Sequence, residues 1–255
     1  MCPLTFFDKL LKNAGNTSIQ EISQYISADC HIFKQNNNCK GSIGYYYSTT
    51  NEGCYIYNIN PALAIILNHQ TFEKLAKFQA RYASKYDILS LQRTFTNKRI
   101  PYITVKDGSA YQVTKLMETV GSIDFTGFKQ LYIIIMSHGT KGDIIHTKDG
   151  CYNINDTVLS PLLRNETLKP IQKLIIINPC RTGDMESDLV QVSPLRLPQN
   201  LTIMYSAAKD RESYLFKSGA LFIQKFCEDF EKPFTVYSLG NIFERLKMKL
   251  SIEME

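Results

Sequence analysis

The 255-residue sequence lacks tryptophan, dense runs of lysine or arginine, and apolar stretches long enough to cross a membrane. A membrane-spanning helix needs about 18 or more largely apolar residues. The N-terminus also lacks the apolar segment of a secretory signal. The net charge of +5 comes from 29 basic and 24 acidic residues, without the clustered basic face that nucleic-acid binding requires. We therefore expect neither a membrane nor a nucleic acid as a partner.

The cysteines form no C-x-x-C pair, and their number is odd. They are Cys2, Cys30, Cys39, Cys54, Cys151, Cys180 and Cys227. This pattern argues against a zinc framework or a disulfide scaffold. Unpaired cysteines in a chain with an ordinary hydrophobic content of 44% fit a reducing compartment. We expect a cytoplasmic protein without a metal or organic cofactor.

Strand and helix patterns alternate from residue 61 onward. Buried strands are predicted at 62–67, 102–105, 131–136, 174–177 and 201–205. Helices are predicted at 87–95, 109–120, 155–163, 219–230 and 236–252, with a small hairpin inside 141–152. Ser109 is a candidate N-cap and Gly121 a candidate helix stop. The alternation predicts an α/β fold with a mostly parallel sheet and helices on both faces.

Two of the predicted strands end on reactive side chains. The run Leu131–Met136 leads into Ser137-His138-Gly139, and 174–177 leads into Asn178-Pro179-Cys180-Arg181. Open α/β sheets place their sites at the carboxyl ends of strands, so neighbouring strands would bring His138 and Cys180 together. An imidazole next to a thiol can supply the thiolate, which is the nucleophilic form.

Each of these residues also has a simpler interpretation. A lone Cys180 is more often a buried core thiol, and a lone His138 is more often a hydrogen-bonded histidine at the edge of a loop. Their joint placement favours a catalytic pair. Gly139 allows a close backbone approach, so its amide and that of Cys180 could form an oxyanion hole; otherwise Gly139 makes only a turn.

Four segments, in order and at suitable spacing, resemble caspases. The first two are Ser137-His138-Gly139 and Asn178–Thr182, which look like the segments of the caspase catalytic histidine and cysteine. Arg81, Asp87 and Leu91 resemble the caspase pattern R-x-G-x-x-x-D-x-x-x-L. Tyr205-Ser206 and Phe222-Ile223-Gln224 are similar to the start of the small subunit.

The resemblance covers about residues 55–250 and implies a caspase-like three-layer sandwich. It also implies that Arg81 binds the carboxylate of a substrate aspartate, next to Asn178, and that Tyr214 lines a neighbouring subsite. His138 and Cys180 would then be catalytic, in a cysteine endopeptidase that cleaves after aspartate and promotes apoptosis.

The sequence departs from the caspase pattern at several positions. Asn178 replaces glutamine, Pro179 replaces alanine and Thr182 replaces glycine. Caspases carry a second arginine in the aspartate pocket, and the alignment places Leu215 there. Arg211 or Lys217 could substitute for it. A buried carboxylate needs charge-assisted partners, so the loss of one arginine weakens or broadens the selection of aspartate.

The caspase resemblance also implies a division of the chain. Residues 1–57 form a short prodomain-like extension, 58–188 a large-subunit-like region and 189–255 a small-subunit-like region. The extension is shorter than an adaptor-binding death-fold domain, which favours the executioner type. The loop 184–188 offers Asp184 and Asp188 as autocatalytic cleavage sites, with Asp188 preferred; a plain acidic surface loop is equally compatible.

Two alternatives to an aspartate-specific enzyme stay open. A caspase-like decoy that binds and regulates other caspases is favoured by Leu215 and by an end at Glu255, before the family's last strand and dimer interface. A related peptidase of another specificity, such as a metacaspase, is opposed by Arg81. The expected partners are protein substrates and other caspase-like chains, in homo- or heterodimers. The setting is cell death, either in a host or in a pathogen that exploits a host.

Overall fold

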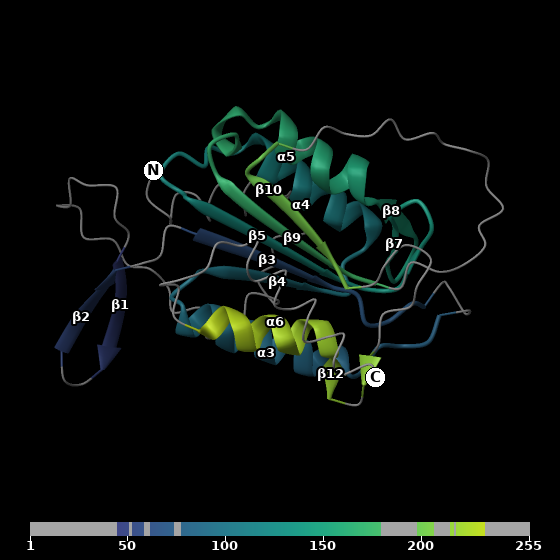
Figure 1. Ribbon diagram of the computed structural model, residues 1–255, viewed down its shortest axis with the longest axis horizontal. Coiled ribbons are helices and arrows are strands. Elements are labelled where there is room, and N and C mark those ends of the chain that lie inside the picture. Colours follow the sequence, from purple (N-terminus) through teal and green to yellow (C-terminus); the bar gives the residue numbers. More distant parts are fainter. Residues whose placement is uncertain are drawn as a thin grey trace.

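The computed structural model describes residues 45–50, 53–58, 62–73, 78–179, 198–206, 215–216 and 218–232. Its centre is a five-stranded parallel sheet in the order β10-β9-β5-β3-β4. The strands are β3 (Ala62–Asn68), β4 (Tyr102–Lys106), β5 (Gln130–Met136), β9 (Gln172–Asn178) and β10 (Leu201–Tyr205). Helices cover both faces of the sheet (Figure 1). The predicted α/β fold and all five predicted strands are therefore confirmed.

The central strands are continuous apolar runs because both of their faces are covered. All seven residues of β3 are buried, as are the last six residues of β5 and of β9. Such strands lack the alternation of polar and apolar residues that marks a sheet with one wet face. Odd-numbered residues of β3 and β5 pack on one side of the sheet and even-numbered residues on the other.

One side of the sheet is covered by α4 (Ala110–Ser122) and by the shorter α5 (Ser160–Arg164). Ser109 caps α4 as predicted, since its side chain accepts from the Gln112 backbone N–H and the Gln112 side chain accepts from the Ser109 N–H. Gly121 was predicted as the helix stop, but α4 continues to Ser122. A Cβ at Gly121 would lie 2.7 Å from Cβ of Pro161, so this glycine serves the close packing of α4 on α5.

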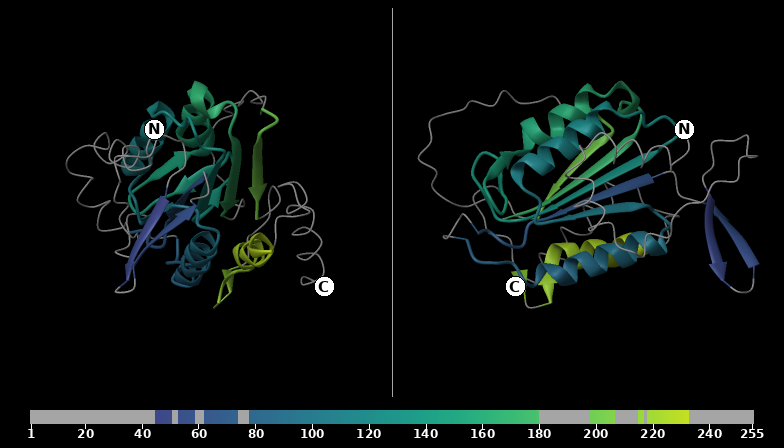
Figure 2. Two further views of the ribbon diagram at one scale, coloured as in Figure 1. Left: turned by 90° about the vertical axis from the view of Figure 1, so that its left-hand side faces the viewer. Right: turned by 180° about the vertical axis from the view of Figure 1, so that it is seen from behind.

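The other side is covered by α3 (Ser84–Asn97) and α6 (Leu221–Glu231), which lie next to each other (Figure 2). Their apolar residues, including Leu91, Phe95, Phe226 and Phe230, pack on the even-numbered residues of the sheet. The helix predicted from 219 begins only at Leu221. The backbone of Gly219 has φ +111°, which is incompatible with a helix, and Gly219–Ala220 form a strand instead.

In the described part of the chain, three small antiparallel sheets accompany the main one. Near the carboxyl edge lie β6 (Gly139–Thr140), β7 (Ile144–His146) and β8 (Cys151–Asn153), which contain the predicted hairpin. A second sheet pairs β11 (Leu215–Phe216) with β12 (Gly219–Ala220). The third pairs β1 (Tyr45–Thr50) with β2 (Gly53–Asn58). All of it except Asn58 lies in the predicted extension, where no strand was expected.

The remaining elements are short. A π-helical turn, η1 (Asn155–Leu159), leads into α5, so the predicted 155–163 helix is confirmed, and a 3-10 turn, η2 (Glu166–Leu168), follows. The predicted helix at 236–252 lies outside the described residues. Within the described part of the chain, no helix is long and apolar enough to span a membrane.

Candidate active site

The two strand ends singled out in the sequence belong to neighbouring parallel strands. β5 and β9 pair along their whole length, and the register places Met136 opposite Asn178. Adjacent strands lie about 4.8 Å apart. Ser137-His138 and Pro179 therefore leave the sheet side by side at its carboxyl edge. Cys180, which follows directly in the sequence, lies outside the described residues.

The backbone around His138 is held by β7. The His138 carbonyl accepts a hydrogen bond from the His146 N–H at 3.0 Å. The Ser137 hydroxyl donates to the His146 carbonyl at 2.5 Å. Gly139 is buried and pairs with Ile145 in the same small sheet. These bonds fix the turn that carries the imidazole.

The His138 ring has a defined tautomer. Its Nε2 lies 2.7 Å from the backbone carbonyl oxygen of Gln79. A carbonyl oxygen can only accept, so Nε2 carries the proton. In the neutral imidazole, Nδ1 is then the unprotonated nitrogen, which can accept a proton from another group.

Two phenylalanines surround the His138 imidazole. The Phe72 ring centroid lies 4.8 Å away, and the Phe78 ring stacks on it at 5.0 Å. On Phe78, the His146 ring also packs, at 4.3 Å. Desolvation by this environment lowers the pKa of His138; the bond to Gln79 raises it and the charge of Arg81 lowers it again. The imidazole is thus kept neutral near pH 7.

Arg81 is buried at the same edge, between the end of β3 and the start of α3. Its backbone N–H donates to the Gln70 carbonyl at 2.8 Å, and Nη1 donates to the His69 carbonyl at 3.3 Å. Burial lowers the pKa of His69 to about 3, and it also lowers the pKa of His138. The positive charge of Arg81 lowers both pKa values further. Both histidines therefore lie within range of the Arg81 charge.

Asn178 lies at the end of β9 and is buried. Across Met136 it is in register with Asn68, the last residue of β3. Both polar atoms of the Asn68 amide are buried without a hydrogen-bond partner. Buried amides are rarely left unpaired. The two asparagines therefore mark the carboxyl edge as a polar end of an otherwise apolar sheet.

The other residues predicted for the site are not placed. Tyr214, Asp184 and Asp188 lie outside the described residues, as does Cys180. The contacts of Gln79, Phe72 and Phe78 with the His138 imidazole were not predicted from the sequence. All three lie between β3 and α3, and the strand-end rule that identified His138 also applies to the segment after β3. In the described part of the chain, no group of three His, Cys, Asp or Glu side chains is placed to hold a metal ion.

Comparison with known proteins gives consistent matches. The family model of the caspase domain matches residues 61–255. Caspase-3 from Felis catus is 23% identical over 206 residues, which covers 76% of this chain and 73% of that protein. Caspase-3 from Oryctolagus cuniculus is 23% identical and that from Mus musculus 22% identical, with the same coverage.

Proposed function

The chain belongs to the caspase domain family, and from this membership we propose that it is a cysteine endopeptidase that cleaves after aspartate. The observation that carries the proposal is the pairing of β5 with β9, in which Met136 lies opposite Asn178. This register puts the residues just before His138 and Cys180 at one edge of the sheet. A histidine and a cysteine at that edge are the two groups that thiol proteolysis needs.

The tautomer of His138 suggests how the proton moves. Because Nε2 donates to the Gln79 carbonyl, Nδ1 is the nitrogen that exchanges protons during the reaction. Nδ1 takes the proton of the Cys180 thiol, and the resulting thiolate attacks the scissile carbonyl carbon. The C–N bond then breaks as the same proton passes from Nδ1 to the leaving amine. Water then hydrolyses the thioester, which returns the thiol and releases the acid product.

Charge that develops on the carbonyl oxygen needs donors in place. We assign this role to the backbone amides of Gly139 and Cys180. Arg81 binds the carboxylate of the substrate aspartate, with Asn178 beside it and Tyr214 at a neighbouring subsite. Support for Arg81 comes from its burial and from its electrostatic effect on His138, since a buried guanidinium at this edge is an anion-binding group.

The proposed biological role is that of an executioner caspase that promotes apoptosis from the cytoplasm, in a host or in a pathogen of that host. Residues 1–57 act as a short prodomain, and 58–188 and 189–255 as the large- and small-subunit regions. Autocatalytic cleavage after Asp188, or after Asp184, separates the two regions. Protein substrates and a second caspase-like chain are the partners.

A decoy that regulates other caspases is the second candidate. It is favoured by Leu215, since an apolar residue at the position of the second pocket arginine cannot bind a carboxylate. A decoy would bind active caspases without turning over peptides. A peptide-cleavage assay therefore separates the peptidase from the decoy.

The test is incubation of the purified chain with fluorogenic peptides that carry each amino acid before the scissile bond. We expect cleavage after aspartate by the wild type and none by Cys180→Ala with an unchanged melting temperature. Arg81→Ala should lose more than about tenfold in kcat/KM for aspartate, the scale of one charge-assisted hydrogen bond. Equal activity of wild type and Cys180→Ala would remove Cys180 as the nucleophile, and an unchanged preference for aspartate over asparagine in Arg81→Ala would remove Arg81 from the pocket.

Cleavage of the chain itself is measured on a gel, with the same purified wild-type and Cys180→Ala proteins. Wild type should separate into pieces, whereas Cys180→Ala should stay intact until an active caspase is added. Full activity of the uncut Asp184→Ala/Asp188→Ala variant would show that this cleavage does not activate the enzyme.

A further inference from the structure

Asp87 is a fully buried carboxylate on α3, and the hydrogen bonds that reach it from other elements come from residues 220 and 224. The Ala220 backbone N–H donates to its two oxygens, with N···O distances of 2.9 and 3.1 Å. The Gln224 side-chain amide donates to Oδ1 at 2.7 Å. The carboxylate thus ties the first turn of α3 to β12 and α6, which lie about 130 residues further along the chain.

The amide of Gln224 is oriented from its other end. The Ser90 hydroxyl, one turn after Asp87 on the same face of α3, donates to Gln224 Oε1 at 2.7 Å. With its oxygen held by Ser90, Gln224 presents its N–H to Asp87, and the three side chains satisfy one another. We refer to Ser90, Gln224 and Asp87 as the α3 clasp.

The clasp also fits closely around β12. Gly219 has φ +111°, and a Cβ there would lie 2.4 Å from Asp87 Oδ1 and 2.8 Å from Gln224 Nε2. The β11–β12 register pairs Gly219 with Phe216 and Ala220 with Leu215. The residue that donates to Asp87 is therefore the strand partner of Leu215, and β12 lies at the same end of the sandwich as β7 and β8 (Figure 1).

We propose that Asp87 is a positioning residue that fixes the β11–β12 hairpin against the start of α3 and thereby sets the preference for the substrate residue before the scissile bond. The inference rests on the proposed peptidase function. Arg81, six residues before Asp87, supplies one wall of the pocket. The caspase resemblance gives Leu215 the position of the second pocket arginine, and we assign the other wall of the pocket to the β11–β12 hairpin that carries it. Asp87 holds the two walls at a fixed separation.

The electrostatics of Asp87 fit this positioning role. Burial raises its pKa to about 6, while the bonds from Gln224 and Ala220 and the charge of Arg81 lower it. Burial raises the pKa of the Cys227 thiol on α6, and the negative charge of Asp87 raises it further. A carboxylate kept in this apolar layer costs stability unless its hydrogen bonds offset the desolvation, which accounts for the three bonds converging on it.

The test compares two substitutions of Asp87 with a control on the same helix. Asp87→Leu removes the shared acceptor, whereas Asp87→Asn keeps an oxygen at the Oδ1 position for both donors. Thr94→Val, the control, breaks a different α3–α6 contact, the 3.1 Å bond from Thr94 Oγ1 to Glu231 Oε1. We expect Asp87→Leu to raise KM for aspartyl peptides roughly tenfold with a smaller change in kcat, and Asp87→Asn to stay within about threefold of wild type. Thr94→Val should lower the melting temperature and leave KM unchanged.

Hydrogen–deuterium exchange of peptides that contain Ala220 gives a readout that does not depend on activity. Asp87→Leu should speed exchange of this amide at least about tenfold, the loss of one hydrogen bond, while Asp87→Asn should leave it near the wild-type rate. If Asp87→Leu does not fold, Gly219→Ala tests the same contact from the hairpin side, with the same expected rise in KM and in exchange rate.

The outcomes separate the inference from the proposed function. Unchanged exchange in a folded Asp87→Leu protein would overturn the anchoring role, and faster exchange with an unchanged KM would overturn the role in substrate preference. A wild-type protein that cleaves no peptide would refute the proposed function and the substrate preference with it, while exchange would still decide whether Asp87 anchors the hairpin.

Discussion

The two helical layers of the sandwich are built on different principles. The layer of α4 and α5 packs mainly aliphatic side chains on the sheet, and its helices come from one continuous stretch of the chain, residues 110–164. The layer of α3 and α6 joins two distant segments and buries polar groups at their contact, among them Asp87 and Thr94. Both layers contain buried hydrogen bonds, but those of the first join segments closer in sequence, as from Asn165 to the Val120 and Ile123 carbonyls, 45 and 42 residues away. In the second layer they join segments 133 and 137 residues apart.

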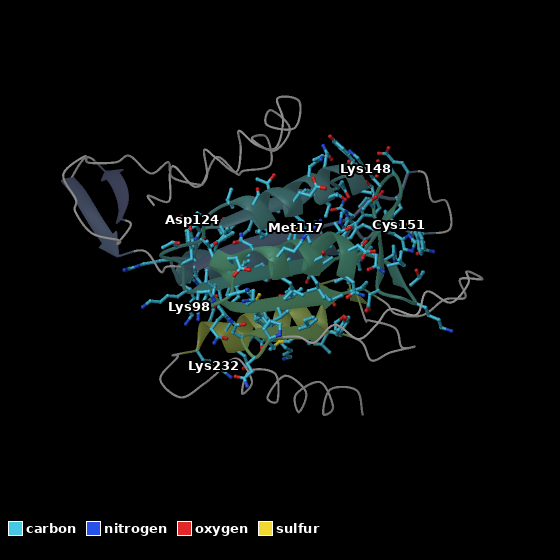
Figure 3. All side chains as sticks on the ribbon, turned by 90° about the horizontal axis from the view of Figure 1, so that it is seen from above. Lys98, Met117, Asp124, Lys148, Cys151 and Lys232 are labelled. Atoms are coloured by element: carbon cyan, nitrogen blue, oxygen red, sulfur yellow. The ribbon has the colours of Figure 1, made fainter. Side chains whose placement is uncertain are left out.

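Those hydrogen bonds run along the whole contact between α3 and α6. The α3 clasp occupies the end at the carboxyl edge of the sheet. At the other end, Lys98 donates to the backbone carbonyls of Glu231 and Lys232 at 3.0 Å each, and Lys98 and Lys232 lie at the same end of the molecule in Figure 3. Since the proposed processing loop separates these helices in sequence, this contact would hold the two pieces together after cleavage.

The largest expected effect comes from one core leucine in each layer. Leu116→Ala in α4 and Leu91→Ala in α3 both remove a side chain that is at most 3% exposed, so each should cost about 2–5 kcal/mol of unfolding free energy. Corrected for the folded fraction, kcat/KM should be unchanged in Leu116→Ala and reduced in Leu91→Ala, because Arg81 lies three residues before the start of α3. Urea unfolding and steady-state kinetics measure both quantities. An equal loss of kcat/KM in the two variants would contradict the claim that the α3 layer, and not the α4 layer, positions the site.

The layers also differ in how their buried titratable groups respond to pH. His69 lies at the carboxyl edge against Tyr152, which packs in the α4 layer, and burial lowers its pKa from 6.5 to about 3. Between pH 6.5 and 3 the unfolded chain therefore takes up a proton at His69 that the native state does not. The contribution of His69 to the free energy of unfolding falls as the pH falls. Over pH 7 to 4 the loss from this group is about 3 kcal/mol. His69→Gln should lose correspondingly less than wild type in urea unfolding at the two pH values.

Asp87 in the α3 layer supplies a control of opposite sign. Its pKa is raised from 3.8 to about 6, so the native state takes up the proton before the unfolded chain does. The contribution of Asp87 to the free energy of unfolding therefore rises as the pH falls from 6 to 3.8. Asp87→Asn should consequently lose more stability than wild type on acidification. A His69→Gln protein with the same acid dependence as wild type would show that His69 is protonated in the native state.

Much of the fold could be predicted from the sequence, because each central strand is an apolar run bounded by turn residues and each helix of the α4 layer carries local signals such as the Ser109 cap. The α3–α6 contact could not, since it depends on pairs such as Asp87 and Ala220 that no local pattern connects. For the same reason the helix start at 219 was wrong: the apolar pattern fits a helix, but tertiary contact around Gly219 selects a strand. Within the candidate site, His138 was identified as a side chain at a strand end and Arg81 from the resemblance to the caspase pattern, whereas the partner of His138 at Gln79 is a backbone carbonyl, which any residue could supply.

The smallest expected effect comes from two matched hydroxyls, one in each layer. Ser109 caps α4 by accepting from the Gln112 N–H at 3.0 Å, and loss of such a cap costs about 1 kcal/mol. Ser90 donates to Gln224 at 2.7 Å in the α3 clasp, and loss of a single hydrogen bond of this kind costs a similar amount. Thermal unfolding should therefore barely distinguish Ser109→Ala from Ser90→Ala.

Steady-state kinetics should distinguish the two variants, because without Ser90 the Gln224 amide is free to turn its oxygen toward the Asp87 carboxylate, which repels it. We expect KM for aspartyl peptides to rise about threefold in Ser90→Ala and to stay at the wild-type value in Ser109→Ala. A matching KM in the two variants would mean that the orientation of Gln224 does not reach the substrate, and that the polar bonds of the α3 layer contribute stability alone.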